Sequence, residues 1–343
     1  MATWTVGAPR DRTRKTSKSR KRMSTHSDVA FTRCAAETVS PLARRLVAID
    51  GGGLRSAGLR TYIVGHGEVA LIDPDPASGP LMRAILEATE GERISHIVIS
   101  HSHGRRSPLG AQLAERFGAD VVSGAMGLRD RELIYGLDWT LEAIATPGHT
   151  PDHFAFALAE EDTVFCGDLV SGWTPEVATP PGGDLSALLA SIELILSERF
   201  ELLLPALGPR VSNASAFLHE CLHDAARCER RIAAVVDSDG PTSAWRLAKQ
   251  ASSALRGIPV AEAHAILAHL VRMQARGDLT STAPLSLFTP FTLAPRSNSL
   301  VESIEGRRGV SDRCSLGISR ASPTARLSAR APVGDLAEHR SAP

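Results

Sequence analysis

The sequence predicts an α/β protein in which helices cover two sheets, followed by a small helical domain. Short apolar runs typical of buried strands alternate with amphipathic stripes typical of helices as far as residue 211. Beyond residue 212 the strand-like runs stop and the apolar positions follow a helical period. The predicted divisions are a disordered basic arm over 1–42, the α/β domain over 43–211, the helical domain over 212–280 and a disordered tail over 281–343.

The first half of the α/β domain is predicted to run strand, strand, helix, strand, helix. Residues 61–64 and 69–72 are two apolar runs on either side of a glycine-containing turn. The run at 96–99 is short, which favours a buried strand. The two helices are predicted to begin at serine caps, Ser78 and Ser107. A proline follows Ser107 in the first turn of the second helix.

The second half adds strands that end at polar residues. Strand-like runs end at Thr146 and at Asp168, and another buried run covers residues 202–204. Asp184 opens a helix whose leucines and isoleucines share one stripe. This alternation is what predicts two helix-covered sheets.

The helical domain is predicted to contain three helices. The first has an apolar face from Phe217 to Val235, the second is capped by Thr242 or Ser243, and the third spans 260–276. From about residue 281 the chain is rich in Ser, Arg, Pro and Ala without periodicity, which is typical of a disordered tail.

Composition and charge exclude a strongly basic folded core. Apolar residues make up 43% of the chain, enough for a sizeable core, and the formal net charge is zero. Basic side chains concentrate at the ends: residues 1–45 carry net +8 and residues 281–343 net +3, which leaves −11 for the stretch between them. The usual electrostatic footprint of a nucleic-acid binder is therefore missing from the core, and 4% aromatic residues offer few platforms for stacking bases.

The expected location is cytoplasmic. No apolar run reaches the roughly 18 residues needed to span a bilayer, and the basic N-terminus lacks the apolar region of a secretory signal. Five cysteines, at positions 34, 166, 221, 228 and 314, form no C-x-x-C pair and no paired framework, which suits a reducing compartment.

Histidines and a carboxylate follow three of the predicted strands. His101 and His103 stand two apart directly after the strand at 96–99, and His149 and Asp168 lie at the ends of two later strands. Loops at strand carboxyl ends point side chains into the crevice there, so these four residues can converge on one ion. Three imidazoles and one carboxylate suit zinc, and also iron or manganese.

The chain resembles the metallo-β-lactamase superfamily of hydrolases in the order of its motifs. These are H-S-H at His101, T-P-G-H ending at His149, and G-D ending at Asp168. The segments 60–65 and 71–73, and Gly172-Trp173 after the G-D pair, are also similar. The resemblance covers roughly residues 43–280. Because a helical domain follows the α/β domain, the chain is most similar to the lactamase-like branch that carries a C-terminal winged-helix-like domain. The resemblance implies an αββα sandwich; some members of that branch are endoribonucleases and others act on thioesters.

The resemblance fails at the family's second metal site. The family loop H-x-H-x-D-H reads His101-Ser102-His103-Gly104-Arg105-Arg106, and the late P-G-H-G-P motif has Leu207 in its histidine position. Arginine has no acceptor atom and stays charged, so it cannot bind a metal. The resemblance therefore implies one Zn²⁺ (or iron or manganese) per chain, held by His101, His103, His149 and Asp168, the last being the family's bridging ligand.

Three residues are predicted to act in catalysis: Asp168, Arg105 and Arg106. The two arginines can pair with Asp168 or clamp an anionic substrate; the alternative is that they point into solvent. One ion at an open zinc site still lowers the pKa of a water to about 7, whereas a four-ligand site can be closed and structural. His153, four residues after His149, is expected to support the ligands through hydrogen bonds.

A second metal motif, His219-Glu220-Cys221-Leu222-His223, matches the H-E-x-x-H string of zinc proteases. The apolar stripe of this predicted helix runs through Cys221, which places His219 and His223 on the opposite, solvent-facing side. No third ligand follows, so a protease is not expected.

The expected function is hydrolysis of an ester, thioester, lactone or phosphodiester in a small-molecule substrate. Two alternatives remain: a catalytically inactive relative that uses the pocket to bind a ligand, and a protein that binds or cleaves RNA or DNA through the winged-helix-like domain. The third helix of that domain offers only Arg272 and Arg276 as cations, which gives nucleic-acid binding little support. No membrane partner is expected, and the sequence leaves the oligomeric state open.

Overall fold

The computed structural model describes residues 36–48, 59–74, 79–102, 106–173, 178–251 and 260–295. Two mixed sheets form the α/β domain within these ranges. The first has the order β1 (Glu37–Thr38), β2 (Ala43–Ala48), β3 (Leu59–Val64), β4 (Glu68–Ile72), β5 (Arg93–Ile99), β6 (Asp120–Ser123). The second has the order β11 (Leu202–Pro205), β10 (Thr163–Gly167), β9 (Phe154–Leu158), β8 (Thr140–Ala145), β7 (Leu133–Tyr135).

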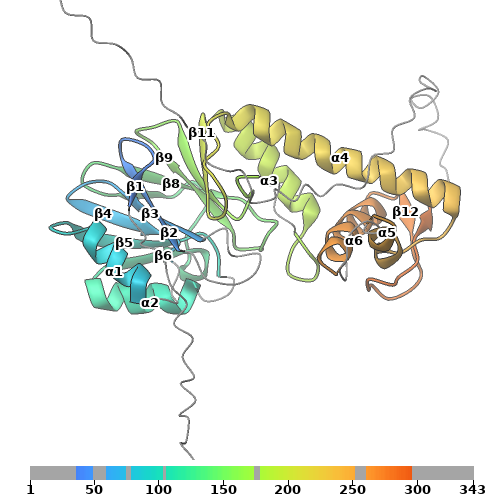
Figure 1. Cartoon of the computed structure of the whole chain (residues 1–343), viewed down its shortest axis with the longest axis horizontal. Helices are drawn as coiled ribbons and strands as arrows, with labels where there is room; N and C mark the ends of the chain where they lie inside the picture. Colours follow the sequence, from blue (N-terminus) through green and yellow to red (C-terminus); the bar gives the residue numbers. More distant parts are fainter. Residues whose placement is uncertain are drawn as a thin grey trace, which may run out of the picture. The chain divides into compact units, whose positions relative to one another are not determined.

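Helices cover the outer face of each sheet, so the α/β domain is an αββα sandwich. Helices α1 (Gly79–Ala88) and α2 (Arg106–Phe117) lie beside the first sheet (Figure 1), and they share a buried cluster with β3, β4 and β5. Helices α3 (Leu185–Glu198) and α4 (Ala214–Asp239) share another with β9, β10 and β11. The predicted fold class is thereby confirmed, and a short 3₁₀ helix, η2 (Gly124–Met126), follows β6.

The period-2 alternation of each strand divides its side chains between two cores. On β3, Tyr62 and Val64 face the core between the sheets, whereas Ile63 faces the core beneath α1 and α2. The register Tyr62↔Ile72 continues the inner face onto β4. A strand buried on both faces reads as a continuous apolar run, which is what the sequence has here.

Several strands end at one edge of the sandwich. β4, β5 and β6 are parallel neighbours, as are β10 and β11, so their carboxyl ends lie together. The amide of Phe154 at the start of β9 donates to the carbonyl of Ser100, just past β5, and joins the two sheets there. The residues after β5, β8 and β10 are the ones that carry the predicted chemistry.

The helical domain consists of α4 with α5 (Ala244–Ala251), α6 (Val260–Ala275) and an antiparallel pair, β12 (Leu279–Thr280) and β13 (Thr292–Leu293). Its apolar core includes Ile232, Leu247, Leu270 and Phe291. Ser243 caps α5 by accepting a hydrogen bond from the amide of Arg246. Three helices followed by a strand pair suit a winged-helix-like domain, and that designation stays a prediction.

A buried carboxylate ties α4 to α6. Glu229 on α4 is 7% exposed and lies 2.6 Å from Arg272, 2.9 Å from Arg276 and 3.5 Å from His269. Burial alone would raise the pKa of Glu229, but hydrogen bonds from His269 and Arg272 and the charges of both arginines lower it to about 2. Glu229 thus stays ionised inside the helical domain.

Two strands form outside the predicted folded range of 43–280. β1 forms within the predicted basic arm because Glu37 and Thr38 pair with β2. Residues 281–295 lie in the predicted tail, but Phe291 is fully buried and β13 pairs with β12. The predicted cap Ser78 lies outside the described residues, as does the side chain of Ser107.

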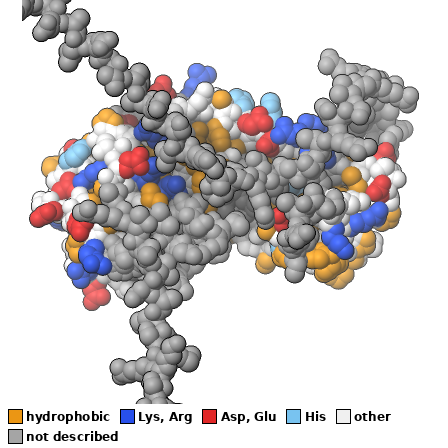
Figure 2. Space-filling model, viewed as in Figure 1, with side chains coloured by type: hydrophobic (Ala, Val, Ile, Leu, Met, Phe, Trp, Pro, Cys, Tyr) orange, Lys and Arg blue, Asp and Glu red, His pale blue; other side chains and the backbone are white. Residues whose placement is uncertain are grey.

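Surface chemistry agrees with the mixed charge of the sequence. On the face shown in Figure 2, acidic and basic side chains are interspersed over the described surface. Among the described helices, none is both long and apolar enough to cross a membrane.

Candidate metal centre

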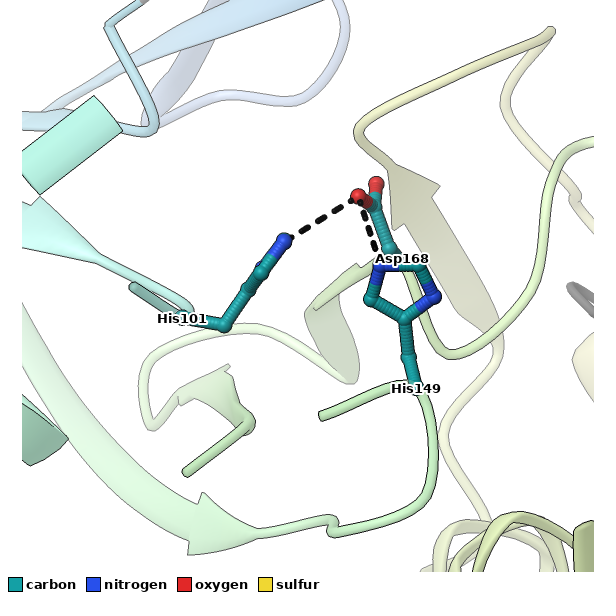
Figure 3. A group of neighbouring side chains, drawn as sticks. All are labelled: His101, His149 and Asp168. Carbon is teal, nitrogen blue, oxygen red and sulfur yellow. Dashed lines mark ion pairs between the residues drawn. The ribbon is translucent and has the colours of Figure 1, made fainter. Parts of the chain in front are cut away.

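Three predicted ligands converge at the edge where the strands end. His101 follows β5, His149 follows β8 and Asp168 follows β10, and Figure 3 shows both imidazoles directed at the carboxylate. The Nε2 atoms of His101 and His149 lie 3.4 Å and 3.7 Å from Oδ2 of Asp168. Within the described residues, this is the group of metal-type ligands whose donor atoms converge.

The spacing fits a shared ion. Ligand atoms at zinc–nitrogen and zinc–oxygen distances of 2.0–2.2 Å in a tetrahedron are about 3.3–3.5 Å apart. The measured 3.4 Å and 3.7 Å are close to that separation. A protonated histidine beside Asp168 would also satisfy one of these contacts, but two imidazoles meeting one carboxylate oxygen favour a metal.

A hydrogen-bonded relay fixes the tautomer of His101. Ser100 Oγ donates to Oδ2 of Asp73 at 2.7 Å, because a carboxylate can only accept. The same hydroxyl lies 3.0 Å from Nδ1 of His101 and must therefore accept its proton. Nε2 of His101 is left with a lone pair on the side of Asp168, which is the form that binds a metal.

The loop that begins at His101 is also held from the second sheet. Oδ2 of Asp152 accepts a hydrogen bond from the amide of Ser102 at 3.0 Å. Burial would raise the pKa of Asp152, but hydrogen bonds from Ser102 and Thr150 lower it. Asp152 therefore stays ionised and anchors the loop.

The loop that carries His149 is fastened to α3. The amide of Asp184 donates to the carbonyl of Gly148, and Ser191 Oγ donates to the carbonyl of Pro147. Gly148 has φ +144°, and a Cβ there would lie 2.4 Å from the backbone of Leu188. Glycine therefore allows the loop to pack directly on the helix.

His153 supports the ligands and uses both of its ring nitrogens to do so. Its Nδ1 lies 2.8 Å from Thr146 Oγ1, and its Nε2 accepts a hydrogen bond from the amide of Asp168 at 3.0 Å. Burial, and then the neighbouring His101, lower the pKa of His153 to about 3. A neutral His153 thus fixes the backbone from which the Asp168 carboxylate projects.

Of the other predicted site residues, some lie outside the described part of the chain and two lie on α4. His103 and Arg105 lie outside the described residues; Arg106 begins α2, and its side chain lies outside the described set. His219 and His223 are exposed on α4, as expected from their position opposite the apolar stripe of this helix.

Sequence reasoning missed the supporting roles of three residues: Asp73, Ser100 and Asp152. Asp73 directly follows β4, at the same edge of the sandwich as the ligands, and Ser100 directly precedes His101. Those positions were the signals available in the sequence.

An αββα sandwich with histidines and an aspartate at its strand ends defines a metal-hydrolase type of protein. Residues 114–209 match the family model described as "Metallo-beta-lactamase superfamily". A beta-lactamase domain protein from Burkholderia ambifaria superposes with a TM-score of 0.62 at 15% identity, covering 78% of this chain and 98% of that one. A metallo-beta-lactamase family protein from Thermus thermophilus gives 0.57 at 17% identity, covering 75% and 100%. Residues 114–209 thus resemble the metallo-β-lactamase superfamily in sequence, and the α/β domain shares its fold with these two solved structures.

The relatives of similar sequence include lactamase-like proteins and ACP thioesterases. "Lactamase-like protein adaB" of Aspergillus niger is 28% identical over 211 residues, which cover 58% of this chain and 65% of the relative. An "Atrochrysone carboxyl ACP thioesterase" of Claviceps purpurea is 29% identical over 175 residues, covering 48% and 55%. The matches span less than two thirds of the length of these relatives.

Proposed function

We propose that the protein is a metal-dependent hydrolase that cleaves a thioester with a single bound ion. The observation that carries the proposal is the convergence of His101, His149 and Asp168 at the strand ends. The sequence adds His103, two residues after His101, as a further ligand.

The chain's own residues have separate tasks in this proposal. His101, His149 and Asp168 hold the ion, and the Ser100–Asp73 relay keeps Nε2 of His101 unprotonated. When bound, the ion supplies Lewis acidity, which polarises a carbonyl and lowers the pKa of a water to about 7. Arg106, at the start of α2, and Arg105 beside it are proposed to attract an anionic group of the substrate.

A single ion follows from the ligands that this chain lacks. The half-buried Leu207 occupies the position of the family's late histidine, and arginines replace two further ligands. Leucine and arginine offer no lone pair to a cation. Zinc is the proposed metal because two or three imidazoles and a carboxylate suit it best.

The thioester is favoured over other acyl bonds by the names of several relatives. The protein of Claviceps purpurea and one of Paecilomyces divaricatus, 28% identical over 214 residues, are both named as ACP thioesterases. For this chain the proposed substrate class is therefore an acyl thioester.

The test is hydrolysis of a thioester panel by the zinc-loaded protein, followed through release of free thiol. Wild type should release thiol, and His149→Ala and Asp168→Asn should reduce kcat/KM by about 100-fold or more, equivalent to about 3 kcal/mol of transition-state stabilisation. His219→Ala, which removes an exposed histidine of α4, is the matched control and should retain full activity.

The result separates the alternatives. Equal rates for wild type and Asp168→Asn would show that the metal centre is not catalytic. A protein that binds zinc but cleaves no thioester, ester, lactone or phosphodiester would be an inactive relative.

A further inference from the structure

The loop after β10 exposes an aromatic side chain close to the candidate metal centre. This loop begins at Asp168, one of the three converging ligands, and reaches Trp173 five residues later. Trp173 is 42% exposed, although tryptophan is among the side chains that gain most from burial. Single exposed apolar residues are common, so the argument depends on where Trp173 lies and how it is held.

The segment between the metal ligand and Trp173 is fixed by the core. Leu169 and Val170 are completely buried, in the cluster that the second sheet shares with α3 and α4. The amide of Leu169 also donates to the carbonyl of Cys166 at 3.0 Å. The position of Trp173 relative to the ligand is therefore set by the packed part of the loop.

The loop after β11 lies against the loop that carries the ligand. β10 and β11 are parallel neighbours, and the amide of Ala206 donates to the carbonyl of Gly167 at 2.9 Å. The amide of Gly172 donates to the carbonyl of Leu207 at 2.8 Å. These two hydrogen bonds hold Leu207 at the same edge of the sandwich as Trp173.

Glycines bring the two loops into direct backbone contact. A Cβ at Gly172 would overlap the carbonyl oxygen of Pro209. A Cβ at Gly208, which has φ +93°, would lie 2.6 Å from the nitrogen of Gly172 and 3.0 Å from Cε3 of Trp173. One part of the indole thus rests on the Gly208 backbone, and its exposed part is left for a ligand.

The side chains that these two loops bring together are apolar. Trp173 is exposed, and the half-buried Leu207 stands in the sequence position of the family's late histidine. Neither side chain has a lone pair for a cation, but both gain free energy when an apolar group displaces water from them. This surface therefore suits the uncharged acyl part of a substrate.

We propose that Trp173 determines specificity by binding the acyl group of the substrate, with a preference for an aromatic acyl group. The inference rests on the proposed thioester hydrolysis, since the acyl group of a thioester at the metal centre must extend over the neighbouring surface. An aromatic ring stacks on an indole or meets it edge to face, which adds to the gain from burying apolar area. An acetyl group covers little of the indole and gains correspondingly less.

Hydrolysis of two thioesters that share one leaving group measures this preference. The substrates are the 2-naphthoyl and acetyl thioesters of N-acetylcysteamine, and the readout is the ratio of their kcat/KM values, from which intrinsic reactivity cancels between variants. Trp173→Ala should lower the naphthoyl-to-acetyl ratio about 10-fold, mainly through KM for the naphthoyl substrate. Trp173→Phe keeps a ring and should lower the ratio by less than about 3-fold.

Tyr135→Ala is the matched control, because it removes a 64% exposed aromatic side chain from the opposite edge strand of the same sheet. The ratio should not change in this variant. A Trp173 that only stabilised its loop would instead slow both substrates equally when replaced by alanine, and the ratio would stay constant.

A binding measurement separates this inference from the proposed function. The probe is the 2-naphthylmethyl thioether of N-acetylcysteamine, which cannot be hydrolysed, titrated into the full-length protein by calorimetry. Its Kd should rise about 10-fold in Trp173→Ala and stay constant in Tyr135→Ala. If wild type hydrolyses no thioester, the proposed function fails and the thioether affinities alone decide.

The inference is overturned if wild type does not bind the thioether, or if Trp173→Ala binds it as tightly as wild type. It is also overturned if wild type hydrolyses both thioesters and Trp173→Ala leaves their ratio unchanged.

Discussion

The buried carboxylate that joins α4 to α6 gives a quantitative prediction for Glu229→Gln. The pKa of Glu229 falls from an ordinary 4.5 to about 2 in the folded protein. At 1.36 kcal/mol per pKa unit, this difference corresponds to about 3 kcal/mol of folding stability at neutral pH. Loss of one partner of a buried ion pair costs roughly 3–5 kcal/mol, a range that includes this value.

The pH dependence has a definite sign. Since the folded pKa lies below the unfolded one, the contribution of Glu229 is complete above about pH 4.5 and is lost as the pH falls toward 2. Burial alone would lower the pKa of His269, but contacts with Cys228 and Glu229 raise it to about 9. The contribution of His269 is therefore complete below about pH 6.5 and is lost as the pH rises through 9.

Urea denaturation monitored by circular dichroism measures these effects. At pH 7, Glu229→Gln should lower the unfolding free energy by about 3 kcal/mol, and the difference from wild type should shrink by about half near pH 3. Glu220→Gln, on the same helix but 61% exposed, should change stability by less than about 0.5 kcal/mol. Equal stability of Glu229→Gln and Glu220→Gln, or a Glu229→Gln effect that is independent of pH, would contradict the role of the buried Glu229 carboxylate.

Three further predictions concern the metal centre and its supports. Ser100→Ala should weaken zinc affinity by about 10–100-fold in a chelator competition, because Nδ1 of His101 loses its acceptor; unchanged affinity would contradict the relay. Gly148→Ala should destabilise the fold by more than about 2 kcal/mol in urea, because its methyl group would meet the backbone of Leu188; a neutral effect would contradict that packing. Asp184→Ala should cost about 1 kcal/mol by removing the cap of α3, and Glu193→Ala on the same helix serves as control.

Most of the fold could be predicted from the sequence because local patterns and tertiary burial agree. Each predicted strand of the α/β domain is a strand, and Asp184 caps its helix by accepting from two backbone amides. The strands that form outside the predicted α/β and helical domains could not be predicted in this way. Phe291 is held by long-range packing and Glu37 by pairing with β2, and neither leaves a periodic signal in its own segment.

The candidate site was predicted less completely than the fold. Positions directly after strands identified His101, His149 and Asp168, which do meet in space. The relay through Asp73 and Ser100 depends on hydroxyl and carboxylate orientations across two strands, which sequence spacing does not encode.

Elemental analysis of the full-length protein after zinc loading and desalting tests directly whether the α/β domain holds one ion. About one zinc per chain is expected, with little remaining in Asp168→Asn. Two ions per chain would contradict the loss of the second site, and none would contradict a metal centre at His101, His149 and Asp168.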